Sequence, residues 1–252
     1  MDHRIALLNA FYRGLPRDRA KIETSAFGFD FLERLLGTDT RLEYGELTLS
    51  GVLHKYKLAG ISAAHMDRLL HDHVAQTCNV CLYFDEVAND VFCFNLDNNH
   101  KTENTVVIPE MECAVRALRD LLTGLGCEPL VIASGRGFHV WGRLQQAVPN
   151  GRLHEFLLRA AVKTLARLHA EGLDHQQVKI NLYPDKRLQG AVSLRLFGTA
   201  HAKNKVFSRV LTPEGLLDEA DSWKCFEEHL HRRTIGPEAF DAAAAELARA
   251  FA

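Results

Sequence analysis

The sequence lacks the long apolar runs that a membrane span requires, because no window comes near ~18 consecutive apolar residues. It has only 6 cysteines in 252 residues, too few for a disulfide framework at this length. It is also not depleted in apolar residues, which make up 47%, so extended disorder is disfavoured. Arg13 interrupts the short apolar stretch near the start, and no small-residue cleavage site follows. We therefore expect a globular, cytoplasmic protein without membrane contact.

A general excess of positive charge is missing too, since the formal net charge is −2. Residues 186–209 are an exception: they hold six Lys or Arg and His201, but no Asp or Glu. Such a run is often only a solvated face. It can also bind polyphosphate or a nucleic-acid backbone, so the segment needs support from other motifs.

The periodicity of the sequence predicts mainly helices over the first 75 residues, with Ser62 as the N-cap of one of them. LTLSGVLHKYKL could form short strands there. CNVCLYF and DVFCFNL are rich in β-branched and aromatic residues, and the residues between them, 85–89, favour a hairpin. The alanine-rich end, FDAAAAELARAFA, predicts a terminal helix.

From DVFCFNL onward, the expected elements follow the order βαββαβ. This order is typical of an α+β fold with an RRM/ferredoxin-like core, whose antiparallel sheet can leave one face open. We expect a helical N-terminal region over residues 1–77, this core over 78–210, and a C-terminal helical segment over 211–252. An open face is where a ligand would bind.

Three polar motifs come at strand ends of this core. In FNLDNNHK, Asn95 and Asp97 share a strand face and could bind Mg²⁺ through oxygen, although Asx residues also simply end strands. In SGRGFHVW, Gly135 and Gly137 permit a tight turn, Ser134 and Arg136 can donate to phosphate, and His139 lies on the following strand, although a plain glycine turn with a buried His is the alternative.

The third motif lies within residues 181–205. Asp185 follows a proline at a strand end and could be a metal ligand or a surface ion-pair partner. Arg195 lies on the next strand, and His201 follows Gly198. Together these cationic groups suit a triphosphate or a nucleic-acid backbone.

The ordered set, NLDNNHK, then SGRGFHVWG, then a late Asp followed by a basic strand, resembles the archaeo-eukaryotic primase superfamily over about residues 78–210. Within it, the motifs are most similar to the bacterial branch found in mobile-element conflict systems. The resemblance implies a primase-polymerase, a nucleotidyltransferase that joins nucleoside triphosphates on a single-stranded or primed DNA template. It leaves open a helicase or nuclease partner.

The resemblance also implies roles for particular residues. Asp97 and Asp185 would bind Mg²⁺ or Mn²⁺, with Asn95 as the third catalytic position. The nucleotide-binding residues would come from the turn and the late basic strand: Ser134, Arg136, Gly137, His139, Arg195 and His201.

Asn95 departs from the family, which has an acid there. An amide oxygen brings no charge, so metal binding should be weaker, unless Asp85, Glu86 or Asp90 compensates. One alternative is therefore a degenerate domain that binds nucleotide or nucleic acid without polymerising, and another is a domain whose basic strand docks a partner protein.

A structural zinc site is a further option in HDHVAQTCNVC, which offers His71, His73, Cys78 and Cys81. The spacing disfavours it, because two histidines two residues apart on a helix diverge.

Overall fold

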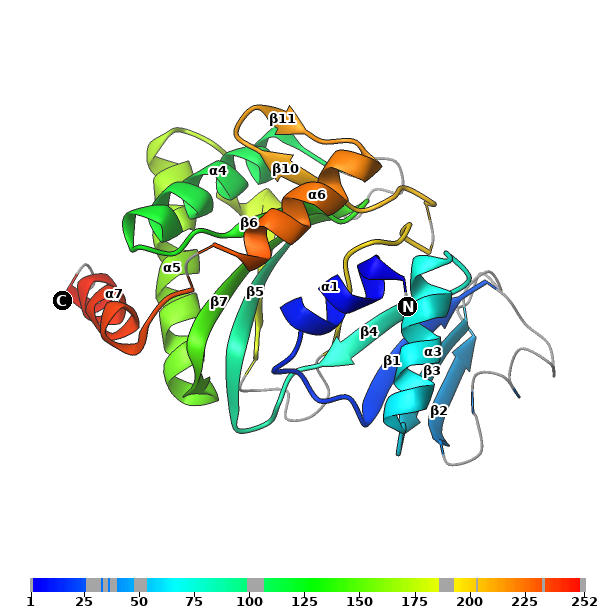
Figure 1. The fold of residues 1–252 in the computed structure, drawn as a ribbon. Helices are drawn as coiled ribbons and strands as arrows, with labels where there is room; N and C mark the ends of the chain where they lie inside the picture. The colour runs from blue at the N-terminus through cyan, green and yellow to red at the C-terminus, as the bar shows by residue number, and fades with distance from the viewer. Residues whose placement is uncertain are drawn as a thin grey trace.

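The computed structural model of the chain describes residues 2–25, 33, 36, 40–47, 54–98, 107–185, 193–202, 204–232 and 234–249. Its strands form two sheets that lie side by side (Figure 1). The N-terminal sheet has the strand order β2-β3-β1-β4-β9, and the C-terminal sheet has the order β11-β10-β6-β7-β5-β8. No helix in the described part of the chain is long and apolar enough to cross a membrane.

The N-terminal sheet is built mostly before residue 84, and β9 joins it from far along the chain. Its elements and the helices next to it are α1 His3–Phe11, β1 Arg19–Thr24, β2 Arg41–Leu47, β3 His54–Ala59, α3 Ala63–Val74, β4 Asn79–Tyr83 and β9 Ser193–Arg195. Ser62 is the N-cap of α3, as predicted. Residues 29–37, which fall within the expected helical region, lie mostly outside the described residues.

The expectation of a mainly helical N-terminal region is wrong for the described residues, because β1, β2 and β3 pair there into one antiparallel sheet. Ala20, Ile22 and Thr24 of β1 are buried in alternation with less buried residues, which is the strand period of two. This alternation over six residues indicates a strand, and the prediction of helices did not take it into account.

The C-terminal sheet confirms the predicted α+β core. The strands of this core and the helices between them are, in chain order, β5 Ala88–Asn98, α4 Pro109–Gly124, β6 Leu130–Ala133, β7 Gly137–Pro149, α5 Asn150–Ala170, the 3-10 turn His175–Gln177 and β8 Val178–Tyr183. Strands β6, β7, β5 and β8 are neighbours in that order and all pair antiparallel. This βαββαβ arrangement is the RRM/ferredoxin-like one.

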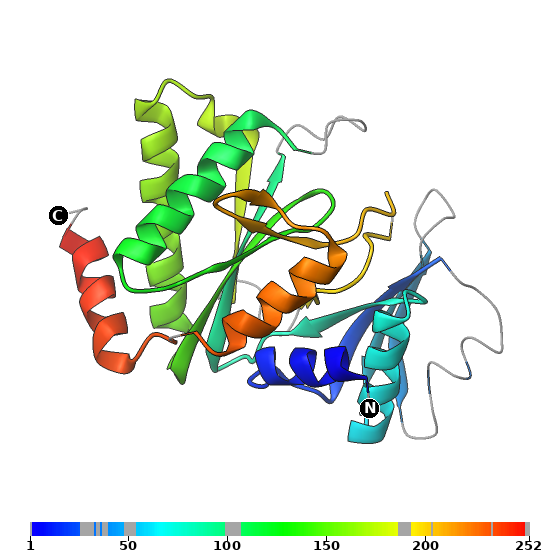
Figure 2. The ribbon, with the colours of Figure 1, turned by 45° about the horizontal axis from the view of Figure 1, so that its top comes forward.

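The remaining elements flank the core. They are β10 Arg209–Thr212, β11 Gly215–Leu216, α6 Glu219–Leu230 and α7 Pro237–Arg249. Helices α4 and α5 cover one face of the C-terminal sheet, with α7 against α5, whereas α1 and α6 lie along the other face near the N-terminal sheet (Figure 2).

The predicted hairpin of CNVCLYF and DVFCFNL is wrong. β4 pairs with β1 and β9, and β5 pairs with β7 and β8 in the other sheet. The carboxylate of Asp85 accepts from the backbone N–H groups of Val87 (2.8 Å) and Ala88 (3.1 Å), so the connecting loop is held in a turn of its own. The chain therefore passes from one sheet to the other here, and a domain boundary at residue 77 would separate β4 from its own sheet partner β1.

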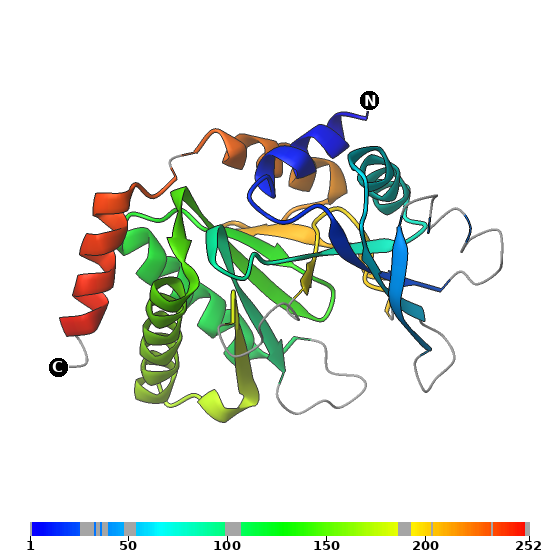
Figure 3. The ribbon, with the colours of Figure 1, turned by 90° about the horizontal axis from the view of Figure 1, so that it is seen from below.

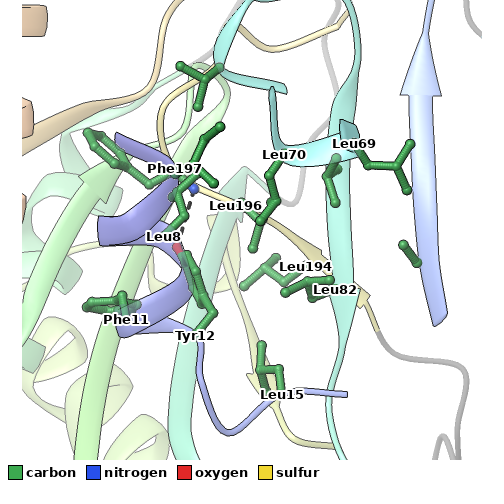
Figure 4. Close-up of a cluster of buried hydrophobic side chains, with 14 of the residues drawn as sticks. Leu8, Phe11, Tyr12, Leu15, Leu69, Leu70, Leu82, Leu194, Leu196 and Phe197 are labelled. Atoms are coloured by element: carbon green, nitrogen blue, oxygen red, sulfur yellow. Dashed lines mark hydrogen bonds between the residues drawn. The ribbon is translucent and has the colours of Figure 1, made fainter. Parts of the chain in front are cut away.

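Two apolar clusters hold the layers together. One lies between the C-terminal sheet and α4, α5 and α7. The other joins both sheets through α1, α3 and α6, and its aromatic centre includes Phe11, Tyr12 and Phe197 (Figure 4). Because this second cluster contains buried residues of both sheets, the two sheets share one core.

Candidate functional site

The strand face of the C-terminal sheet opposite α4 and α5 becomes polar toward the C-terminal end of β5. Trp141 and Tyr183 lie opposite Cys93, on the buried side of this face. Two residues along, His139 and Asn181 lie opposite Asn95. We call the polar part of this face, with Asn95, Asp97, His139, Lys179 and Asn181, the site face.

Asp97 is the acceptor for two amides. Asn95 Nδ2 donates to its Oδ2 at 3.0 Å, and Asn181 Nδ2 donates to the same atom at 3.1 Å. Asn95 reaches it from two residues along β5, and Asn181 reaches it from β8. We call Asn95, Asp97 and Asn181 the amide cluster; it contains one carboxylate and two neutral side chains.

Arg195 comes to this region from the N-terminal sheet. Its side chain is only 7% exposed, and Nη2 donates to the backbone carbonyl of Ser134. Nη1 is buried without a hydrogen-bond partner, and within the described chain no carboxylate lies at ion-pair distance from the guanidinium. A buried cation without an ion-pair partner is costly, so this arrangement favours a bound anion.

His139 lies beside Arg195 and is 7% exposed. Burial, and to a smaller extent the charges of Arg195 and His201, lower its pKa from 6.5 to about 3. The ring is therefore neutral at neutral pH and can donate one hydrogen bond without adding charge. We call His139, Arg195 and His201, together with the Ser134 turn, the cation cluster.

The glycine turn at Gly135 packs against the loop that follows β9. Gly135 has φ +89°, and a Cβ there would lie 3.0 Å from both His201 Cβ and the Val206 carbonyl oxygen. The side chain of Asn204 donates to the Gly135 carbonyl. The hydroxyl of Ser134 donates to the Gly137 carbonyl at 3.2 Å, so it closes the turn and points inward.

Two predicted residues of this turn differ in what they do. Arg136 is exposed at the tip and makes no hydrogen bond or ion pair to another described residue, so it is available to a ligand. Gly137 does not have positive φ; a Cβ there would lie 2.0 Å from the Leu96 carbonyl oxygen, so glycine is required for the pairing of β7 with β5. We assign Gly137 to the sheet and not to phosphate.

A row of cationic side chains crosses the N-terminal sheet toward the cation cluster. Lys57 lies opposite Lys21, Lys21 opposite Cys81, and Cys81 opposite Arg195. The alternate residues Ile22, Leu58 and Leu82 are buried in the shared core, so this row lies on the other, polar face. We call Lys57, Lys21 and Arg195 the basic row; sequence reasoning missed its two lysines, since only the register aligns them. Glu23, two residues along β1 on the same face, pairs with Lys21 at 3.0 Å, so the charge of Lys21 is shared with a carboxylate.

The two sheets lie side by side when the molecule is seen from below (Figure 3), and Tyr183 of β8, opposite Cys93, is influenced by charged groups of both sheets. Burial raises its pKa to about 12, and the charges that act on it come from Cys93 and Asp97 of β5 and from Lys21 of the N-terminal sheet. Its ring contacts that of Phe84, with 5.7 Å between centroids. Charged groups of the basic row and of the site face therefore both act on Tyr183.

Asp185 does not lie next to Asp97 in the sheet register. Asp97 is opposite Lys179, whereas Tyr183 is opposite Cys93, four residues or ~13 Å away along β5. Asp185 comes two residues after Tyr183. The side chain that β8 places against Asp97 is Asn181, a residue the sequence analysis missed because its strand partner could not be read from spacing.

The other acidic residues that could replace the missing acid at position 95 interact with groups elsewhere in the structure. Asp85 caps its own loop, Glu86 lies 3.6 Å from Arg19, and Asp90 lies 3.9 Å from Arg13. Asp90 is also seven residues from Asp97 along β5, a separation of ~23 Å. None of the three is placed against the amide cluster.

The residues present do not fit a site for two divalent cations. Within the described ranges, no group of three or more His, Cys, Asp or Glu side chains could share an ion. Mg²⁺ is normally bound through one or two carboxylates together with phosphates, and here one carboxylate already accepts two amide N–H groups.

The zinc option also lacks its ligands. His73 is buried; its Nδ1 accepts from the Val80 backbone N–H at 3.0 Å, and Nε2 lies 2.9 Å from the Phe197 carbonyl, to which it donates. Burial lowers the His73 pKa to about 4. Both ring nitrogens are therefore occupied by backbone groups, and the histidine links α3 to β4 and to the segment after β9.

No protein-family model and no curated protein sequence matches the chain. Three solved structures are similar to it. The polymerase domain from Mycobacterium tuberculosis Ligase D, in complex with DNA, has a TM-score of 0.47 and 14% identity, over 98% of this chain and 87% of that one. The AEP domain of the cyanophage S-2L primase-polymerase has a TM-score of 0.40 and 12% identity, over 89% and 97%. The primase RepB' has a TM-score of 0.39 and 13% identity, over 98% and 64%.

The solved structures that the chain resembles are thus polymerase and primase domains. With such low identities and with TM-scores below 0.5, they leave the function to be inferred from the residues of the site.

Proposed function

We propose that this chain binds a nucleic-acid strand, or a nucleoside triphosphate, through its phosphates on the site face and the basic row, and that it does not join nucleotides. The observation that carries this proposal is Arg195: a buried guanidinium, with one nitrogen lacking a hydrogen-bond partner and no carboxylate at ion-pair distance in the described chain. A phosphate oxygen would supply the missing acceptor and the missing charge.

The surroundings of Arg195 favour a phosphate over a small carboxylate ligand. His201 is close enough to His139 for its charge to lower the pKa of that ring, and Arg136 is exposed at the adjoining turn. Lys21, which also pairs with Glu23, and Lys57 place further cationic groups on two more strands, over ~15 Å at the usual strand spacing. A linear series of cations matches a ligand that carries several phosphates in sequence.

A template-dependent nucleotidyltransferase, with Mg²⁺ or Mn²⁺, is the second candidate. The observation in its favour is that Asp97 and the cation cluster share one face, so an acid and a phosphate-binding group are neighbours. Against it, the amide cluster supplies one carboxylate where phosphoryl transfer by two metals needs several. A helicase or nuclease partner stays a prediction.

Two measurements separate these functions. Fluorescence anisotropy with a labelled single-stranded oligonucleotide, and calorimetry with a nucleoside triphosphate, should show binding by the unmodified chain. Primer extension with labelled nucleotides, with Mg²⁺ and then Mn²⁺, should show no product. Product that disappears in Asp97→Ala would instead establish the nucleotidyltransferase.

Arg195→Met should abolish most of the binding, whereas Arg152→Met should not, because Arg152 is an exposed residue paired with Asp241 away from the site face. If the unmodified chain bound neither ligand, the proposal would be wrong, and a role in docking a partner protein would be the remaining hypothesis.

A further inference from the structure

We infer that the ligand is bound without a divalent cation, because the amides of Asn95 and Asn181 occupy the place of metal-binding acids around Asp97. This inference rests on the proposed function only for its ligand, a phosphate; its claim about metal binding concerns the amide cluster alone. The two amides come from different strands and donate to one oxygen, Asp97 Oδ2.

The direction of these two hydrogen bonds determines whether Asp97 can bind a cation. An amide N–H carries partial positive charge, and two of them point at the carboxylate oxygen that a cation would need. A cation at Oδ2 would have to displace both donors, and the cluster offers it one negative charge in total. Mg²⁺ also gives up its own water reluctantly, so a neutral amide oxygen is a poor replacement for a carboxylate.

The phosphates have other partners on the same surface. Arg195, Arg136 and Lys57 carry positive charge of the kind that metal ions supply in a metal-dependent phosphoryl-transfer site, and Lys21 adds a charge that it shares with Glu23. The ligand is therefore neutralised by protein side chains, and its affinity should depend on ionic strength and not on divalent ions specifically.

The strand register indicates that two substitutions would create a metal-binding site in the amide cluster. Asn181 lies directly opposite Asn95, and opposed side chains on adjacent strands have Cβ atoms ~5 Å apart. Asn95→Asp and Asn181→Asp would therefore place three carboxylates within reach of a common ion while keeping side-chain size almost unchanged.

The first test needs no ligand other than the metal. Mn²⁺ is titrated into the unmodified chain and into the Asn95→Asp/Asn181→Asp variant, and free Mn²⁺ is followed by electron paramagnetic resonance. We expect no saturable binding by the unmodified chain below millimolar Mn²⁺, and at least tenfold tighter binding by the variant. The melting temperature of the variant should also rise with Mn²⁺, since the metal binds only the folded state.

Tight Mn²⁺ binding by the unmodified chain that is lost in Asp97→Asn would overturn the inference. So would failure of a folded double variant to bind Mn²⁺, because the two amides would then not be what prevents it. Should the double variant not fold, the single variants Asn95→Asp and Asn181→Asp are titrated in its place, each expected to bind Mn²⁺ more tightly than the unmodified chain.

The second test compares ligand affinity in EDTA and in Mg²⁺ at matched ionic strength. For the unmodified chain, the dissociation constant for the oligonucleotide should agree within twofold. The double variant should bind at least tenfold more weakly in EDTA, because two new negative charges face the phosphates, and should recover affinity with Mn²⁺.

Gln145→Glu/Gln146→Glu is the matched control, since it adds the same charge on an exposed part of β7 distant from His139. It should neither bind Mn²⁺ nor lose the ligand. A tenfold loss of affinity by the unmodified chain in EDTA would contradict the inference. If the unmodified chain binds no oligonucleotide at all, the proposed function fails, and the Mn²⁺ titration still decides whether the amides block the metal.

Discussion

The amide cluster and the cation cluster are neighbours on one sheet face, yet they differ in how their charges are satisfied. In the amide cluster, the carboxylate of Asp97 accepts two internal hydrogen bonds. In the cation cluster, Arg195 is buried with a nitrogen that lacks any acceptor. The first is satisfied by the protein itself, and the second leaves a donor for which we propose a phosphate acceptor. The comparison teaches that, on neighbouring groups, a carboxylate can be internally satisfied while a buried cation is not.

The largest effect should come from Arg195→Met, which removes the charge and keeps much of the packing. We expect at least ~100-fold weaker binding of oligonucleotide and triphosphate, since a buried charge that pairs with its ligand typically contributes ~2–5 kcal/mol. The free energy of unfolding should be unchanged or higher, because a buried cation without an ion pair is costly to desolvate. Calorimetry and urea unfolding check both parts, and a parallel loss of stability and binding would indicate that Arg195 is only structural.

The next effect is a dependence of stability on pH that His139 contributes. Its folded pKa is lowered to about 3, so between pH 6.5 and pH 3 the unfolded chain takes up a proton that the folded chain does not. Stability due to this group is therefore present above pH 6.5 and is lost as the pH falls, by ~2–3 kcal/mol at pH 4.5.

His139→Gln should remove that part of the acid destabilisation, which urea unfolding at pH 7 and pH 4.5 measures. His73→Gln is a useful second variant, because the buried His73 also has a lowered pKa, about 4, but lies away from the site face. Identical pH profiles for the unmodified chain and His139→Gln would show that His139 is protonated in the folded state.

A smaller effect is expected in the basic row. Lys57→Gln should weaken oligonucleotide binding about three- to fivefold and reduce the slope of log affinity against log salt by ~0.7, as one single-strand phosphate contact does. Triphosphate binding should not change, because Lys57 is two strands from Cys81 and three from Arg195. Lys224→Gln, on an exposed position of α6, is the control. Equal losses for both variants would indicate a non-specific charge effect.

The smallest effect should come from Arg136→Ala. An exposed side chain forms ion pairs of up to ~1 kcal/mol, so we expect about two- to fivefold weaker triphosphate binding and no change in melting temperature. A loss as large as that of Arg195→Met would shift the centre of phosphate binding from the buried strand to the turn.

The sequence was enough to predict the C-terminal core, because its strands and helices are long and periodic and follow one another as βαββαβ. It also assigned His139, Arg195 and His201 to one ligand; in the structure Arg195 donates to the Ser134 carbonyl and Arg195 and His201 act on His139, whereas their roles stay predictions. That Arg195 reaches this region from the other sheet, on β9, could not be read from the sequence.

The partners of individual strands could not be predicted in the same way. β4 and β5 have equally strand-like compositions, and nothing local indicates that they enter different sheets. Asn181 and Lys57 matter because of the residues across from them, and that register depends on which strands are neighbours. The expected Asp97 and Asp185 pair relied on spacing along the chain, and the sheet instead brings Asn181 to Asp97.

The aromatic contacts of Phe197 fix the position of the strand that carries Arg195. The backbone N–H of Phe197 donates to the hydroxyl of Tyr12 at 3.3 Å, and its ring stacks on Phe226 with 4.7 Å between centroids (Figure 4). Phe197 follows β9 by two residues, so contacts with the end of α1 and with α6 hold in place the strand that carries Arg195. The position of Arg195 relative to the site face is therefore fixed by packing of the core, and we expect ligand association to depend on diffusion and salt and not on closure of one sheet on the other.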